Sequence, residues 1–96
     1  MQIGVPMEIK SQEYRVGMTP GGVRELVATG HIVQVQTQCG ARIGLTDDLY
    51  REAGAQVIKT AEALFSDCDL IVKVKEPQAR ECRLLRPGQT FSPIYT

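Results

Sequence analysis

The chain has 96 residues, which is enough for one domain near the lower end of the usual size range. Its apolar fraction of 43% and charged fraction of 23% are ordinary for a globular protein. With 11 basic and 11 acidic residues the formal net charge is zero, so composition gives no support to nucleic acid or an anionic membrane as a partner. No apolar run approaches the roughly 20 residues that span a bilayer, and MQIGVPMEIK lacks the features of a secretory leader. We therefore expect a cytoplasmic protein.

The cysteines predict no metal site and no disulfide. Cys39, Cys68 and Cys82 are odd in number and widely spaced, which fits neither a disulfide framework nor paired zinc ligands. His31 is the one histidine, so a mixed Cys/His metal site is disfavoured. We expect reduced thiols that pack as small hydrophobic side chains.

The first predicted elements are a strand and a helix separated by a polar loop. Residues 2–9 (QIGVPMEI) read as a strand interrupted by its proline, and residues 10–15 as the loop. Thr19 is a good N-cap, because its hydroxyl can accept a hydrogen bond from an unpaired backbone N–H, and Pro20 suits the first helical position. Gly30 is the expected end of this helix.

The rest of the chain alternates strands with short helices. The predicted elements are a strand over 31–37, a helix capped by Thr46 and ended by Gly54, a strand over 55–59, a helix capped by Thr60, a strand over 69–75, a helix over 78–86, and the start of a fifth strand after Gly88. This alternation predicts an α/β fold with a mostly parallel sheet and right-handed crossovers.

Two lysines in the fourth predicted strand are candidates for chemistry. In IVKVKEP, Lys73 and Lys75 share one face with Ile71. Both faces of a parallel sheet are usually covered, so lysines are unexpected in its middle, but ligands bind outside the carboxyl ends of the strands. Lys75 lies at that end, where its alternative is a lysine reaching into water. For Lys73 the favoured interpretation is a snorkelling or ion-paired side chain.

Arg15 follows the first predicted strand, so it belongs to the same carboxyl edge of the sheet. A guanidinium group grips a carboxylate with two parallel hydrogen bonds. The alternative is a solvated loop arginine. Together Arg15 and Lys75 predict a pocket for a small anion. For His31 we favour a role at the end of a helix over a catalytic one. The sequence contains neither GxGxxG nor Walker A, and so carries no recognisable nucleotide site.

Two blocks of the sequence resemble a known family. IGVPMEIKSQEYRVGMTPGGVRELVATGH and DLIVKVKEP, followed by LLRPGQT, look like the N-terminal segment of bacterial alanine dehydrogenase. The alpha subunit of nicotinamide nucleotide transhydrogenase is similar but more distant. The likeness covers residues 1–91, and the blocks E-x-R-V-x-x-T-P and V-K-V-K-E-P are specific when they occur together.

The resemblance implies an oxidoreductase that converts L-alanine, NAD⁺ and water to pyruvate, ammonia and NADH. Residues 1–96 would be part of a Rossmann-like substrate domain, and a separate Rossmann domain, absent here, would bind NAD. Arg15 would hold the substrate carboxylate, and Lys75 would be the catalytic lysine that binds the keto or amino end. The resemblance assigns no such role to Lys73. We expect the full-length protein to be a homo-oligomer.

The chain departs from the family pattern at three places. Met7 replaces the lysine of G-V-P-K-E, and Gln38–Cys39 replaces a Gly-Ala pair. After P-G-Q the family reads approximately T-L-F-T-Y-L/I-H, in which the histidine is the catalytic acid–base. Here the chain reads T-F-S-P-I-Y-T, which puts Thr96 in the histidine's place. Threonine cannot exchange protons near pH 7 as imidazole does.

The altered tail suggests a shift of reading frame. Deletion of one nucleotide from codons for TLFTYIH yields TFSPIYT, so we expect a sheet truncated in its fifth strand. Pro93 cannot donate to a sheet ladder, and the last strand is therefore expected to be frayed or misplaced. The isolated chain is expected to be inactive as an enzyme. The alternatives are a non-catalytic module that binds a small anion, or the N-terminal part of a transhydrogenase alpha subunit.

Overall fold

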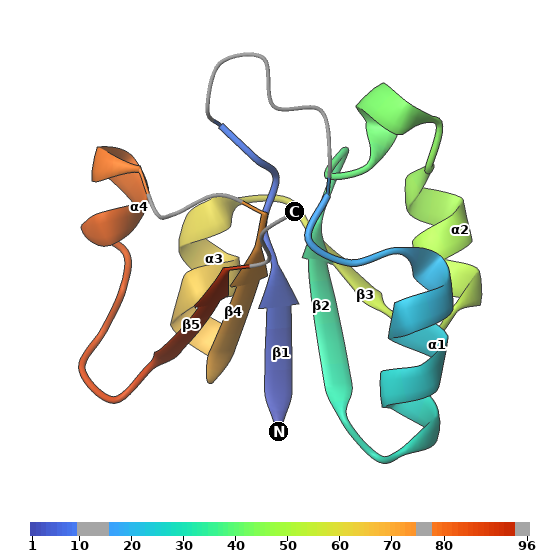
Figure 1. Cartoon of the computed structure of the whole chain (residues 1–96), viewed down its shortest axis with the longest axis horizontal. Coiled ribbons are helices and arrows are strands. Elements are labelled where there is room, and N and C mark those ends of the chain that lie inside the picture. Colours follow the sequence, from blue (N-terminus) through green and yellow to red (C-terminus); the bar gives the residue numbers. More distant parts are fainter. Residues whose placement is uncertain (10–15, 75–77, 94–96) are drawn as a thin grey trace.

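The fold is a five-stranded parallel sheet, given by a computed structural model that describes residues 1–9, 16–74 and 78–93 (Figure 1). The strands are β1 (Gln2–Val5), β2 (Ile32–Gln36), β3 (Gln56–Ile58), β4 (Leu70–Lys73) and β5 (Thr90–Pro93). They lie in the order β3-β2-β1-β4-β5, and every neighbouring pair is parallel. The predicted α/β class is confirmed.

Four α-helices and one 3₁₀ turn lie in the described ranges: α1 (Pro20–Ala28), η1 (Ala41–Ile43), α2 (Asp47–Glu52), α3 (Ala61–Asp67) and α4 (Ala79–Cys82). The three predicted threonine caps are confirmed. The hydroxyls of Thr19, Thr46 and Thr60 accept hydrogen bonds from the third residue after each. These bonds satisfy N–H groups that the helices leave unpaired at their first turns.

The first strand and the last helix are each about half as long as predicted. The first strand ends at Val5 and does not include residues 7–9, which is consistent with Pro6 having no N–H for a ladder. The last helix covers Ala79–Cys82 and not 78–86, and the chain is already in turns before Pro87.

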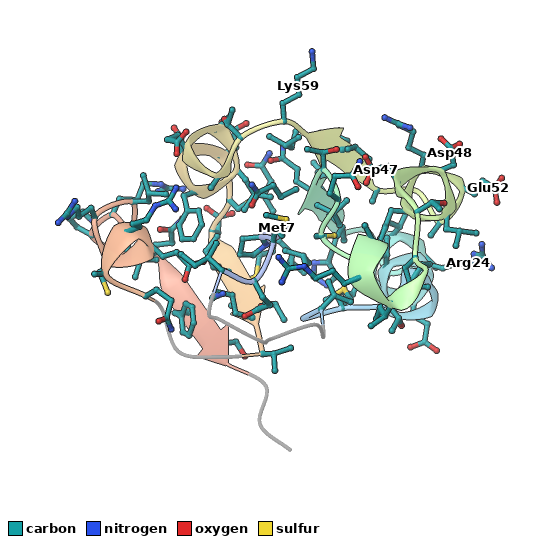
Figure 2. The ribbon with its side chains drawn as sticks, turned by 90° about the horizontal axis from the view of Figure 1, so that it is seen from above. Met7, Arg24, Asp47, Asp48, Glu52 and Lys59 are labelled. Atoms are coloured by element: carbon teal, nitrogen blue, oxygen red, sulfur yellow. The ribbon has the colours of Figure 1, made fainter. Side chains whose placement is uncertain are left out.

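The core consists of two apolar layers, one on each face of the sheet. Helices α1 and α2 cover one face of the sheet and α3 covers the other, as can be seen in Figure 2, which looks down the strands. The first layer contains Ile3, Val5, Val23, Val33, Val35, Tyr50 and Val72, and the second contains Leu64, Phe65, Cys68 and Ile71. Val72 and Ile71 therefore point to opposite faces of β4, as the alternation of its sequence predicted.

The fifth strand is in place over its described length, so the expected misplacement is wrong there. Leu70 pairs with Thr90, and the register continues to Lys73 and Pro93. As the last strand in the sheet order, β5 tolerates a residue that cannot donate to a ladder. The Gln89 amide anchors its start by donating to the carbonyls of Phe65 (2.7 Å) and Cys68 (2.6 Å). Residues 94–96, including Thr96, lie outside the described ranges.

The three cysteines are free thiols in different environments. Cys39 and Cys68 are buried, and Cys82 is exposed. Burial is the main cause that raises the pKa of Cys39 to about 11 and that of Cys68 to about 11. The thiols of Cys39 and Cys68 therefore stay protonated at neutral pH.

We expect a thiol reagent at pH 8 to modify Cys82 quickly and the two buried cysteines only as the protein opens. A thiol with a pKa of 11 is thiolate in about 0.1% of molecules at pH 8, and the thiolate is the reactive form. The release of reagent chromophore over time measures this. Cys82→Ser should remove the fast phase. Three equally fast thiols in native buffer would contradict the buried placement of Cys39 and Cys68.

Candidate functional site

The candidate site is the carboxyl edge of the sheet between β1 and β4. The strand order reverses there, because β2 and β3 continue on one side of β1 while β4 and β5 continue on the other. Open α/β sheets bind ligands in the crevice at such a reversal. Figure 2 looks onto this edge, with Met7 near its centre.

A buried lysine with two carboxylates lies at this edge. The Lys73 ammonium is 2.8 Å from Oε1 of Glu8 and 3.1 Å from Oε2 of Glu81. The side chains of Lys73, Glu8 and Glu81 are 0%, 2% and 4% exposed, respectively. We call these three residues the Lys73 cluster. The sequence left two interpretations of Lys73 open, an ion-paired side chain or a snorkelling one. The structure confirms the ion pair and shows that the snorkelling interpretation is wrong.

Each carboxylate of the cluster also binds the backbone. The other oxygen of Glu8 accepts a hydrogen bond of 3.0 Å from the N–H of Val74. The other oxygen of Glu81 accepts one of 2.9 Å from the N–H of Gln78, which is the N-cap of α4. Both oxygens of each carboxylate are therefore engaged, one with the ammonium and one with an N–H group.

The segment before α1 packs directly on β4. A Cβ atom added to Gly17 would lie 2.6 Å from the carbonyl oxygen of Val72 and 3.1 Å from Cα of Lys73. Backbone atoms cannot yield at such distances, so only glycine fits. The next residue, Met18, is held from the other side, because its carbonyl accepts a 2.7 Å hydrogen bond from the Tyr50 hydroxyl. Burial raises the pKa of Tyr50, which keeps this donor protonated.

The two predicted anion-binding residues, Arg15 and Lys75, lie outside the described ranges. Gly17, two residues after Arg15, packs so closely on the backbone of Val72 and Lys73, just before Lys75, that a Cβ atom would not fit. Sequence reasoning missed Glu8 and Glu81 as partners of Lys73. The available signal was the lysine itself, because a lysine on a covered sheet face requires a buried acid.

A cavity of about 360 Å³ opens at the same edge, on the side of α3 and α4. Its walls are formed by Met7, Ile9, Gln36, Lys59, Thr60, Ala61, Glu62, Arg80, Glu81 and Leu84. Glu81 belongs both to this wall and to the Lys73 cluster. Met7 places a thioether in the wall at the position where the resembled family has a lysine, and its N–H donates to Gln36 (2.9 Å).

His31 lies at the opposite edge of the sheet, since it directly precedes the first residue of β2. Its N–H donates to the carbonyl of Leu26 in the last turn of α1 (3.1 Å). It therefore belongs to the end of that helix and not to the candidate site.

The described ranges contain neither a cluster of metal-binding side chains nor a helix that could span a membrane. Residues 1–9, 16–74 and 78–93 contain no group of three His, Cys, Asp or Glu side chains placed to hold a metal ion. In the same ranges no helix has the length and apolarity needed to cross a membrane.

Known proteins are similar in sequence to most of this chain. Residues 4–95 match the family model described as "Alanine dehydrogenase/PNT, N-terminal domain". Alanine dehydrogenase of Halomonas elongata is 50% identical over 95% of this chain and 24% of its own length. That of Mycobacterium tuberculosis is 46% identical over 93% and 24%. The NAD(P) transhydrogenase subunit alpha of Cereibacter sphaeroides is 42% identical over 99% and 18%.

Solved structures agree with these sequence relationships. An L-alanine dehydrogenase superposes with a TM-score of 0.91 at 46% identity, over 95% of this chain and 25% of its own. A transhydrogenase from Sinorhizobium meliloti superposes with a TM-score of 0.87 at 28% identity, over 95% and 27%. The chain spans about a quarter of the alanine dehydrogenases that it matches. It belongs to the alanine dehydrogenase/PNT N-terminal domain family.

Proposed function

We propose that residues 1–96 are the N-terminal substrate-binding part of an NAD-dependent L-alanine dehydrogenase. The observation that carries the proposal is the contact of Gly17 with β4 at the reversal of strand order. It joins the segment that follows Arg15 to the strand that precedes Lys75. Arg15 and Lys75 are 60 positions apart in the sequence, and the described residues that follow Arg15 and precede Lys75 meet at this edge, which supports the proposal.

In this proposal the two residues hold opposite ends of alanine or pyruvate. The Arg15 guanidinium receives the carboxylate through paired N–H donors, a geometry that lysine cannot reproduce. The Lys75 ammonium donates to the heteroatom on C2 and favours negative charge on the keto oxygen.

NAD accepts a hydride when bound, and we place its site outside residues 1–96, since their sequence lacks the GxGxxG fingerprint. The whole protein would then be a cytoplasmic homo-oligomer that acts on L-alanine and pyruvate.

The second candidate is the corresponding part of a transhydrogenase alpha subunit. It is favoured by 42% identity over 99% of the chain. Alanine dehydrogenase is preferred because the solved L-alanine dehydrogenase has the higher identity, 46% against 28%, and the higher TM-score. A third candidate, a non-catalytic module that binds a small anion, uses the same two residues and differs only in the absence of turnover.

We expect the 96-residue chain to bind pyruvate with a dissociation constant in the millimolar range, about 4 kcal/mol of binding free energy. Titration of ¹⁵N-labelled protein should shift the amide signals of Gly17 and Val74. Arg15→Ala and Lys75→Ala should each abolish the shifts. The matched control is Arg24→Ala, whose side chain points away from the body of the protein in Figure 2. Lys59→Ala separately tests the cavity beside α3 and α4, whose wall includes Lys59.

Two outcomes would overturn this assignment. One is the absence of shifts with the unchanged chain at several tens of millimolar pyruvate, about ten times the expected dissociation constant. The other is loss of binding in Lys59→Ala but not in Lys75→Ala, which would move the ligand into the cavity beside α3 and α4.

We expect no NADH from residues 1–96 mixed with L-alanine and NAD⁺. The resemblance assigns both the nicotinamide site and the catalytic histidine to sequence that these residues do not contain. The absorbance of NADH is the measurement, with a complete alanine dehydrogenase as the positive control. NADH formation that scales with the concentration of the purified chain would contradict this expectation.

A further inference from the structure

We propose that the cavity beside α3 and α4 is a second ligand site, which takes a small aliphatic monocarboxylate. Its volume of about 360 Å³ lies at the lower end of the range for ligand pockets, roughly 300–1,000 Å³. The wall comes from the chain after β1, the end of β2, the start of α3, and α4 with the turn after it. The inference goes beyond the proposed function and does not rest on it, because it uses neither Arg15 nor Lys75.

Part of the cavity wall is apolar. Met7 packs against the first core layer, and Ala61 and Leu84 pack against the second. Ile9 adds a large apolar side chain that is 36% exposed. These side chains border an open space, so an aliphatic chain that enters it displaces water from apolar surface, which is favourable. The unbranched thioether of Met7 adapts readily to the shape of such a chain.

The neutral polar groups of the wall are left with hydrogen-bond donors. The side-chain oxygen of Gln36 already accepts from the N–H of Met7 (2.9 Å), which leaves the NH₂ group for a ligand. The Thr60 hydroxyl oxygen accepts from the N–H of Ala63 (3.2 Å), and its own proton remains available. Both oxygens of Glu81 already have partners. A ligand that accepts hydrogen bonds therefore suits these groups better than one that donates them.

The wall also contains two cations without counter-ions. Within residues 1–9, 16–74 and 78–93, neither Lys59 nor Arg80 has an ion-pair partner. In the same ranges Glu62 is the one acid of the wall that lacks a partner. The unpaired charged groups are thus two cations and one carboxylate, which favours a ligand with a single negative charge.

The two cations have different roles in this proposal. Lys59 lies at the rim, and its side chain points outward in Figure 2, so its ammonium attracts anions to the mouth of the cavity. The Arg80 guanidinium then pairs with the ligand carboxylate, for which its planar set of donors is suited. The aliphatic chain of the ligand lies against Met7 and Leu84.

The first test identifies the chemical class of the ligand with four probes. Titration of the ¹⁵N-labelled chain with hexanoate should shift the amide signals of Gln36, Ala61 and Leu84 but not that of His31, at the opposite edge. Hexanoate should bind at least tenfold more tightly than acetate, because each buried methylene group contributes about a fourfold factor in affinity. Hexanol and hexylamine should bind more weakly than hexanoate. Equal or tighter binding of hexylamine would show that the carboxylates of the wall dominate and would overturn the proposal.

The second test changes charged groups that are exposed and so are not needed for folding. Arg80→Ala should weaken hexanoate binding about fivefold, as the loss of a partly exposed ion pair does. Glu62→Gln should strengthen it about twofold, because a like charge is removed. The matched control is Arg83→Ala, the next arginine along the chain, which is exposed and outside the cavity wall. Equal affinities in Arg80→Ala and Arg83→Ala would contradict the site.

A third variant blocks the cavity without changing any charge. Ala61→Leu places a larger side chain in the wall and should abolish the hexanoate shifts, while circular dichroism checks that the chain remains folded. Undiminished binding of hexanoate to folded Ala61→Leu would overturn the proposal.

Hexanoate and pyruvate together separate this inference from the proposed function. If Arg15→Ala or Lys75→Ala abolishes hexanoate binding and Arg80→Ala does not, hexanoate occupies the proposed substrate site and this inference alone fails. If hexanoate behaves as expected and pyruvate does not bind, the proposed function fails and the second site stands.

Discussion

Burial of the Lys73 ammonium is the constraint on which the arrangement of the carboxyl edge depends. A charge removed from water is costly unless it is paired and hydrogen-bonded. Lys73 is paired with two carboxylates that come from widely separated parts of the chain, one after β1 and one in α4. The requirement to pair one ammonium therefore brings three elements together at the reversal of strand order.

The same constraint explains why this edge is well defined although it is rich in polar groups. Each carboxylate binds both the Lys73 ammonium and a backbone N–H group, and Gly17 leaves no space between the segment before α1 and β4. Apolar layers hold the sheet together on both faces, but they do not specify how its edge is arranged. Directional bonds from charged groups supply that specification, as buried polar networks do when every member is satisfied.

Much of the fold could be predicted from local signals. The threonine caps predict where three helices begin, and the alternation of apolar residues predicts which side chains of β4 share a face. Both effects act within a few residues, so they can be predicted from the local sequence. Sheet order and the partners of Lys73 were not predictable in the same way, since Glu8 is 65 positions from Lys73 and the pairing depends on the three-dimensional fold. The expectation that the fifth strand is misplaced rests on Pro93 alone, and the structure contradicts it. That prediction ignored the position of β5 at the end of the sheet and the anchoring amide of Gln89. Arg15 and Lys75 came from sequence motifs, and their roles remain proposals.

A double-mutant cycle between Glu8 and Lys73 tests the central claim most directly. The free energy of unfolding would be measured by chemical denaturation for Glu8→Gln, Lys73→Met and the double variant. If the buried ion pair organises this edge, Lys73→Met costs about 3–5 kcal/mol, because it leaves two buried carboxylates without their cation. Glu8→Gln costs less, because Lys73 keeps Glu81 as a partner. The double variant should then be more stable than the sum of the single effects predicts, by on the order of 2 kcal/mol. Single effects that add to within about 0.5 kcal/mol would contradict the account.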